Sequence, residues 1–260
     1  MKQGVYTVSF NEPVAASGSV WRMRLQGDTS AFERPGQFVD VALEGRFLRR
    51  PFAAREWDSS GFDIIYKVVG GGTASMTSLR PGALVDCLVG LGNGFSMPPC
   101  VSGGEAQRVL VAAGGIGASP LFSQTAALAR GGYDVTVVLG FNTADEIILL
   151  DEYKSLGVNV IVTTVDGSYG LRGFLTAALE KLHTTRVTRV CATFDYVYAC
   201  GPRVMMKAVC SQVSCPGQVS LEERMGCGCG ICYGCTCQTA DGPRRVCADG
   251  PVFDKEKVVW

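Results

Sequence analysis

The sequence has very little histidine, no excess of charge of either sign and no long apolar run. Its only histidine is His183. A Rieske centre and a Cys2His2 zinc site each need two histidine ligands, so this count excludes both. Lysine and arginine together number 24, as do aspartate and glutamate, so no general basic field attracts nucleic acid or an anionic membrane.

Targeting and membrane signals are also missing from the sequence. Residues 1–4 lead into an alternating segment, and no apolar run approaches the roughly 18 to 20 residues of a membrane span. We therefore expect a soluble, cytoplasmic protein with no nucleic-acid or membrane partner. Hydrophobic residues make up 47% of the chain and charged residues 18%, a balance that favours surface covered by a cofactor or another chain.

The first region, residues 1–100, consists of short apolar runs separated by turn signals such as Pro35-Gly36 and Pro81-Gly82. This pattern predicts a small β-barrel. The expected strands include the alternating residues 21–26 and the runs Phe38–Leu43, Phe62–Val69 and Leu84–Val89.

The second region, residues 101–220, begins with a linker at Ser102–Glu105 and then alternates buried strands with helix-length segments. This order predicts an α/β domain with a parallel sheet that binds a nicotinamide nucleotide. The expected strands are Val109–Ala113, Val135–Leu139, Asn159–Val165 and Tyr196–Ala199. In the third region, residues 221–260, glycine and cysteine dominate and no periodicity persists, so something other than a hydrophobic core must order it. A metal centre would do so.

Six of the 12 cysteines lie in this third region. Four of them give the spacing C-x4-C-x2-C-x11-C, whose first three members match the plant-type [2Fe–2S] loop. The expected ligands are Cys227, Cys232, Cys235 and Cys247. The alternative is a structural zinc, but a zinc ribbon needs a second C-x2-C pair some 15 to 20 residues further on. Cys229 and Cys237 do not belong to this spacing, and neither is assigned a role as a ligand.

Two strand ends carry the features of a nucleotide site. A buried strand ends in Gly114-Gly115-Ile116-Gly117, where bare backbone and a helix N-terminus can meet a pyrophosphate. Another strand ends in Cys200-Gly201-Pro202. Ligands of open α/β sheets bind at the carboxyl ends of the strands. The alternative is that a tight strand-to-helix turn needs these glycines for steric reasons alone.

Cations and glycines in the barrel region fit a flavin phosphate. Arg50 precedes the stiff segment Pro51-Phe52-Ala53, Lys67 ends the run Ile65-Tyr66-Lys67, and Gly72-Thr73 offers free N–H groups and a hydroxyl. An ordinary basic edge strand followed by a loop is the alternative. The other two sites favour FAD, because a nicotinamide gives up two electrons at once and a [2Fe–2S] cluster accepts one.

These segments resemble the ferredoxin–NADP reductase superfamily, whose barrel holds FAD and whose α/β domain holds NAD(P). Three further segments, Asp166–Gly170, Ser220–Met225 and Cys247–Phe253, are similar to the electron-transfer subunits of NAD-dependent dihydroorotate dehydrogenase B. The resemblance implies FAD contacts at Arg50, Pro51, Phe52, Ala53, Ile65, Tyr66, Lys67, Gly72 and Thr73, and ligation of the cluster by the four cysteines. One departure is Ala53, where the family usually has a hydroxyl side chain.

The resemblance also implies a partner, an FMN-containing catalytic subunit, in a heterotetramer with two copies of each chain. The chain would then transfer electrons between FMN and NAD in de novo pyrimidine biosynthesis. Two alternatives remain open. One is an electron-transfer subunit of an NAD(P)H-dependent ferredoxin or bifurcating reductase, against which the four cysteine ligands argue. The other is a nucleotide-binding sensor that is stabilised by zinc and has no redox turnover.

Overall fold

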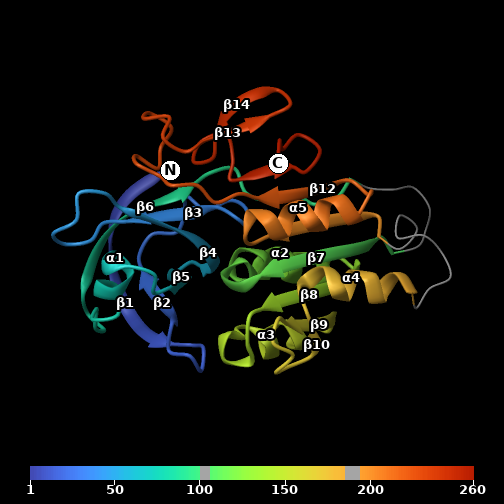
Figure 1. Ribbon diagram of the computed structural model, residues 1–260. Helices are drawn as coiled ribbons and strands as arrows, with labels where there is room; N and C mark the ends of the chain where they lie inside the picture. The colour runs from blue at the N-terminus through green and yellow to red at the C-terminus, as the bar shows by residue number, and fades with distance from the viewer. Residues whose placement is uncertain (100–105, 185–193) are drawn as a thin grey trace. The chain divides into compact units, whose positions relative to one another are not determined.

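The computed structural model describes residues 1–99, 106–184 and 194–260 of the chain (Figure 1). The chain divides into two compact units, each assembled from two separate stretches of sequence. The first unit joins Met1–Phe95 to Glu222–Val252, and the second joins Ser96–Leu221 to Phe253–Trp260. The linker expected at Ser102–Glu105 lies outside the described residues.

The first unit contains a closed barrel of six antiparallel strands, which confirms the barrel predicted from the turn-rich pattern. The strands follow one another around the barrel in the order β1-β2-β5-β4-β3-β6. They are β1 (Lys2–Pro13), β2 (Val20–Gln26), β3 (Phe38–Val41), β4 (Arg50–Asp58), β5 (Gly61–Lys67) and β6 (Leu84–Leu91), and a short helix α1 (Gly71–Met76) follows β5.

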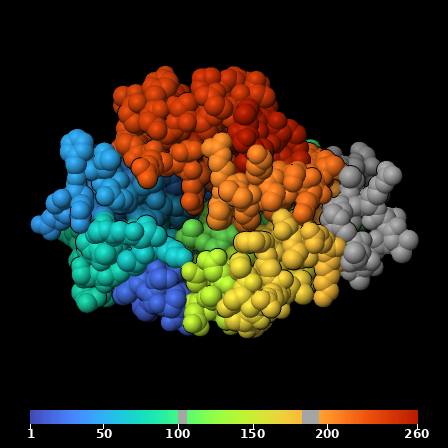
Figure 2. Space-filling model, in the orientation of Figure 1, coloured from blue at the N-terminus to red at the C-terminus, as the bar shows by residue number. Residues whose placement is uncertain are grey.

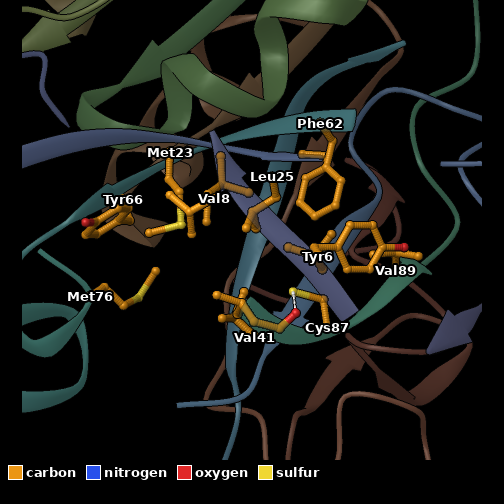
Figure 3. Close-up of a cluster of buried hydrophobic side chains, with 14 of the residues drawn as sticks. Tyr6, Val8, Met23, Leu25, Val41, Phe62, Tyr66, Met76, Cys87 and Val89 are labelled. Carbon is orange, nitrogen blue, oxygen red and sulfur yellow. Dashed lines mark hydrogen bonds between the residues drawn. The ribbon is translucent and has the colours of Figure 1, made fainter. Parts of the chain in front are cut away.

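Alternate residues of these strands fill the barrel interior (Figure 3). In β2, Met23 and Leu25 are fully buried, whereas Arg24 between them forms an ion pair with Asp63 of β5 at 2.9 Å. Burying an apolar side chain of this size contributes about 1.5–3 kcal/mol. The interior is closed by residues from all six strands and from α1, including Tyr6, Val8, Val41, Phe62, Tyr66, Met76, Cys87 and Val89.

The second unit contains a largely parallel sheet, as its sequence pattern predicted. The strand order of the sheet is β10-β9-β8-β7-β11-β12-β15. The strands are β7 (Arg108–Gly114), β8 (Asp134–Phe141), β9 (Asn159–Thr164), β10 (Leu171–Arg172), β11 (Tyr196–Cys200), β12 (Gly217–Ser220) and β15 (Val252–Asp254). The helical segments are η1 (Gly115–Gly117), α2 (Ala118–Arg130), η2 (Ala144–Glu146), α3 (Leu150–Ser155), α4 (Leu175–Thr184) and α5 (Arg203–Gln212).

The order of this sheet reverses beside β7. From β7 the chain adds β8, β9 and β10 on one side, and then adds β11 and β12 on the other. A crevice forms at the carboxyl ends of the strands where such an order reverses, and ligands of open α/β sheets bind there. The strand ends at Gly114 and Cys200 therefore lie at the switch point.

The cysteine-rich segment belongs to the first unit and contains a hairpin of β13 (Thr236–Thr239) and β14 (Gly242–Arg245). Figure 2 shows this segment, in orange-red, at the surface of the chain. It is tied to the barrel unit through Asn93, whose N–H donates to the carbonyl of Gly250 at 2.8 Å and whose side-chain amide donates to that of Val252 at 2.8 Å. The sequence pattern did not predict this hairpin.

Candidate functional site

The switch point of the parallel sheet is built from two turns that lie against each other. A Cβ at Gly117 would collide with the carbonyl oxygen of Cys200, and a Cβ at Gly201 would come within 3.0 Å of the Gly114 backbone. A Cβ at Gly114 would come within 3.0 Å of Pro202. Three of the predicted glycines are therefore required by the packing of one turn against the other.

Gly115 differs from these three glycines. Its φ is +53°, and a Cβ there would meet no atom within 4 Å, so its open side leaves room for a ligand. Ser119, in the first turn of α2, is 1% exposed, and among the described residues its hydroxyl has no hydrogen-bond partner. A buried hydroxyl without a partner beside a helix N-terminus fits a ligand phosphate or sugar. The sequence analysis did not single out Ser119.

The two strands that carry the proposed flavin residues are paired with each other along only part of their length. In the described chain the ladder between β4 and β5 ends at the pair Ala54 and Ile64. Beyond it, residues 50–53 pair with β3, and residues 65–67 pair with β2. Residues 50–53 and residues 65–67 are therefore not hydrogen-bonded to each other in that ladder. Their backbone N–H and C=O groups on this side are available to a cofactor.

Two arginines lie against the start of α1. A Cβ at Gly72 would come within 2.7 Å of Nε of Arg50, and a Cβ at Gly71 would come within 2.9 Å of Nη2 of Arg46. Nη1 of Arg50 donates to the carbonyls of Leu48 and Arg49 at 2.8 and 3.1 Å, which fixes the side chain. Two guanidinium groups held against bare glycines fit a pyrophosphate. The sequence analysis did not single out Arg46.

Several of the other predicted flavin residues serve the barrel itself. The Tyr66 ring lies in the barrel core, and its hydroxyl donates to Oδ1 of Asn11 at 2.9 Å. Burial raises the pKa of Tyr66 to about 12. The Thr73 hydroxyl accepts the N–H of Val69 at 2.9 Å and holds the turn that opens α1. A cofactor contact at residue 66 is therefore available only through the backbone.

The cysteine-rich loop directs backbone N–H groups at sulfur atoms. Sγ of Cys227 accepts N–H groups of Ile231 and Cys232 at 3.2 and 3.4 Å. Sγ of Cys232 accepts the N–H of Gly234 at 3.4 Å, and Sγ of Cys235 accepts that of Cys247 at 3.4 Å. Hydrogen bonds of this kind stabilise thiolates and tune iron–sulfur clusters.

Among the four predicted ligands, the thiol of Cys227 neighbours that of Cys232, and the thiol of Cys235 neighbours that of Cys247. The thiol of Cys229 also hydrogen-bonds to Cys227. Burial opposes ionisation of Cys227, but N–H groups of Cys232 and Cys229 and the thiol of Cys232 lower its pKa to about 6. Burial raises the pKa of Cys247 to about 12, and its hydrogen bond with the Cys235 thiol adds to the rise.

Within the described residues, no group of three or more histidine, cysteine or acidic side chains is gathered closely enough for a single metal ion. A [2Fe–2S] cluster makes a different demand, because each of its two irons takes two thiolates. The two thiol pairs fit that demand. Gly226 and Gly234 lie beside the same loop, where a Cβ would come within 3.2 and 3.5 Å of Sγ of Cys232, so bare backbone surrounds this sulfur.

A buried carboxylate, which the sequence analysis missed, lies beneath the loop. Asp40 of β3 is 2% exposed, and in the described chain its Oδ1 has no hydrogen-bond partner. Burial raises the pKa of Asp40 to about 6. The positive charge of Arg49 opposes this rise, the Cys227 sulfur adds to it, and the positive charge of Arg50 also opposes it. The carboxylate therefore interacts electrostatically both with Arg50, a predicted flavin residue, and with Cys227, a predicted cluster ligand.

Comparisons with known proteins agree with this architecture. Residues 222–259 match the family model described as the iron-sulfur cluster binding domain of dihydroorotate dehydrogenase B, and residues 111–211 match the oxidoreductase NAD-binding domain. The solved structure of an NADH-dependent reduced ferredoxin-NADP oxidoreductase superposes with a TM-score of 0.84 at 30% identity, covering 99% of this chain and 90% of that one. The fold and the site thus define a subunit of a nicotinamide-linked iron–sulfur oxidoreductase.

Two curated relatives are more specific. The electron transfer subunit of dihydroorotate dehydrogenase B (NAD(+)) from Fusobacterium nucleatum is 37% identical over 93% of both chains. The same subunit from Geobacillus sp. (strain WCH70) is 37% identical over 100% of this chain and 99% of its own length. The chain belongs to the family of electron transfer subunits of dihydroorotate dehydrogenase B (NAD(+)). In the part of the chain that is described, every helix is too short or too polar to cross a membrane.

Proposed function

We propose that residues 1–100 bind FAD, residues 101–220 bind NAD, and residues 221–260 hold a [2Fe–2S] cluster. The chain then transfers electrons between NAD and an FMN-containing catalytic subunit in pyrimidine biosynthesis in the cytoplasm, in a complex with two copies of each subunit. The observation that carries the proposal is the cysteine-rich loop, in which backbone N–H groups point at the sulfurs of Cys227, Cys232 and Cys235 and the fourth cysteine, Cys247, donates its own N–H to Cys235.

The side chains of this chain bind and orient the three groups. FAD exchanges two electrons with NAD and single electrons with a cluster. Arg50 and Arg46 hold the FAD phosphates against Gly72 and Gly71, and the open side of Gly115 admits the NAD pyrophosphate. Oxidising dihydroorotate also needs a base that removes a carbon-bound proton, and we assign that base to the partner subunit.

The test separates the half-reactions. The isolated chain is expected to pass electrons from NADH to an artificial acceptor dye and to show no dihydroorotate turnover. Adding the FMN subunit from the same cell should couple orotate formation to NAD reduction. Dihydroorotate oxidation by the single chain, or failure of the FMN subunit to couple with it, would contradict the assignment.

The cluster ligands are tested by iron and sulfide analysis of protein purified without oxygen. We expect two iron and two sulfide per chain, as a [2Fe–2S] cluster requires. Cys247→Ser should lose or destabilise the cluster, because Cys247 is one of the four thiols of the two pairs. Cys229→Ser is the matched control and should retain it. Stoichiometric zinc without iron in the parent protein would overturn the cluster and support a zinc-stabilised sensor.

A second candidate function is the electron-transfer subunit of a ferredoxin or bifurcating reductase. It is favoured by the similarity to the NADH-dependent reduced ferredoxin-NADP oxidoreductase over 99% of this chain. The partner that purifies with the chain from its own cell distinguishes the two functions. An FMN subunit with dihydroorotate activity supports the first function, and a second nicotinamide-linked reductase subunit supports the alternative.

A further inference from the structure

Asp40 lies on the outer face of the barrel wall. Its neighbours in β3, Val39 and Val41, are both 0% exposed and belong to the barrel core, so Asp40 points away from that core. Across the sheet it pairs with Pro51 of β4 and Leu88 of β6. Opposed residues share a face of the sheet, so Asp40 and the proposed flavin residue Pro51 lie on the same side.

The cysteine-rich segment covers Asp40 on that outer face. A Cβ at Gly228 would overlap Oδ2 of Asp40, so the residue after Cys227 lies directly on the carboxylate. Gly228 also has a φ of +65°. Glycine is thus required at residue 228 both by the backbone conformation and by the space that Asp40 takes.

Stability does not account for a carboxylate at this position. Oδ1 is buried, and within the described residues it has no hydrogen-bond partner. Burying such a group is unfavourable, and a polar group without a partner in a native structure calls for a functional explanation. Arg49, a candidate counter-ion, pairs instead with Oδ1 of Asp86 at 3.0 Å. Its hydrogen bond to Asp40 goes to the backbone carbonyl, at 3.4 Å.

We propose that Asp40 is a positioning residue for the cluster: it supports the Cys227–Gly228 turn on strand β3, and its carboxylate places a negative charge beside that turn, which keeps the reduction potential of the cluster low. The inference rests on the proposed function, because it requires a cluster at Cys227. Reduction adds an electron, and a nearby negative charge makes that addition less favourable. The same charge faces the flavin strand through Pro51, so it acts on the step between the two centres.

The experiment is an anaerobic redox titration of the intact chain, followed by electron paramagnetic resonance of the reduced cluster. Asp40→Asn keeps the shape and removes the charge, and it should raise the midpoint potential while keeping the iron content. Asp86→Asn is the matched control. Asp86 lies on the neighbouring strand β6, is more exposed than Asp40 and pairs with Arg49, so this variant also removes one carboxylate charge. It should leave the potential unchanged.

A second pair of variants covers the case in which Asp40→Asn does not retain the cluster. Asp40→Glu and Asp40→Gln have the same length and differ in charge, so the glutamate variant should have the lower potential. Equal potentials in the charged and neutral variants, or an equal shift in Asp86→Asn, would overturn the role of Asp40 and leave the proposed function intact. Loss of the cluster from all the Asp40 variants would overturn the electrostatic role, because the support of the turn alone would then account for Asp40. A parent chain without iron would overturn both.

Discussion

At the scale of single residues, the absence of a side chain at Gly72 leaves room for the guanidinium of Arg50. Gly72→Ala places a methyl group 2.7 Å from Nε and should displace the arginine. Overpacking costs about 1–3 kcal/mol, so FAD binding should weaken by roughly ten- to a hundredfold. Fluorescence titration of the flavin-free protein with FAD measures this change.

The control for that prediction is Gly70→Ala. Gly70 has an extended φ of −174°, and a Cβ there would meet nothing within 4 Å. This variant should bind FAD as the parent does, whereas Arg50→Ala should purify depleted in FAD. A full FAD complement in Arg50→Ala at low free flavin would show that the phosphates bind elsewhere.

At the scale of elements, α2 carries two buried hydroxyls in contrasting environments. The Thr125 hydroxyl donates to the Leu121 carbonyl at 2.8 Å, whereas the Ser119 hydroxyl has no partner among the described residues. Ser119→Ala should therefore leave the free energy of unfolding unchanged or raise it by up to about 1 kcal/mol, and it should weaken NADH binding. Thr125→Val should lower the free energy of unfolding by about 1 kcal/mol and leave NADH affinity unchanged. Denaturant unfolding and NADH titration measure both quantities, and Ser119→Ala with unchanged affinity would exclude the hydroxyl as a ligand contact.

The elements also show what the sequence predicts and what it does not. The sequence predicts strands β2, β7 and β8 correctly. Alternating residues in β2 and short apolar runs in β7 and β8 directly reflect which residues of each strand are buried. The hairpin of β13 and β14 was missed because four-residue strands are too short for a periodic pattern, although Asp241-Gly242 is a hairpin turn signal.

Some site residues depend on contacts between segments far apart in the chain. Cysteine spacing predicts ligands because a short loop brings neighbouring thiols together. Asp40 gave no such signal, because a polar residue between Val39 and Val41 matches an ordinary outward-facing strand position. Its burial arises only when a segment nearly 190 residues later, at Gly228, covers it. Arg46 was missed for the same reason, because its contact with Gly71 joins the segment between β3 and β4 to the start of α1.

At the scale of the whole molecule, the cysteine-rich segment and the barrel form one compact unit. Removing the iron with a chelator should therefore loosen residues 222–252 and also the barrel strand β3 beneath them. Hydrogen exchange followed by mass spectrometry should show faster exchange in both segments. The parallel sheet around β7 and β8 belongs to the other unit and serves as the internal reference. Uniform exchange changes across both units would contradict this expectation.

The first unit is discontinuous in sequence, and this has a consequence for biosynthesis. The barrel residues Met1–Phe95 are synthesised before Ser96–Leu221, and Glu222–Val252 are synthesised only after both. At a synthesis rate of about 5–20 residues per second, on the order of ten seconds pass between completion of the barrel residues and synthesis of the segment that covers Asp40. During that interval Asp40 lacks the cover of Gly228, and the predicted ligand cysteines have not yet been synthesised. A cluster at these cysteines can therefore form only when the polypeptide is nearly complete.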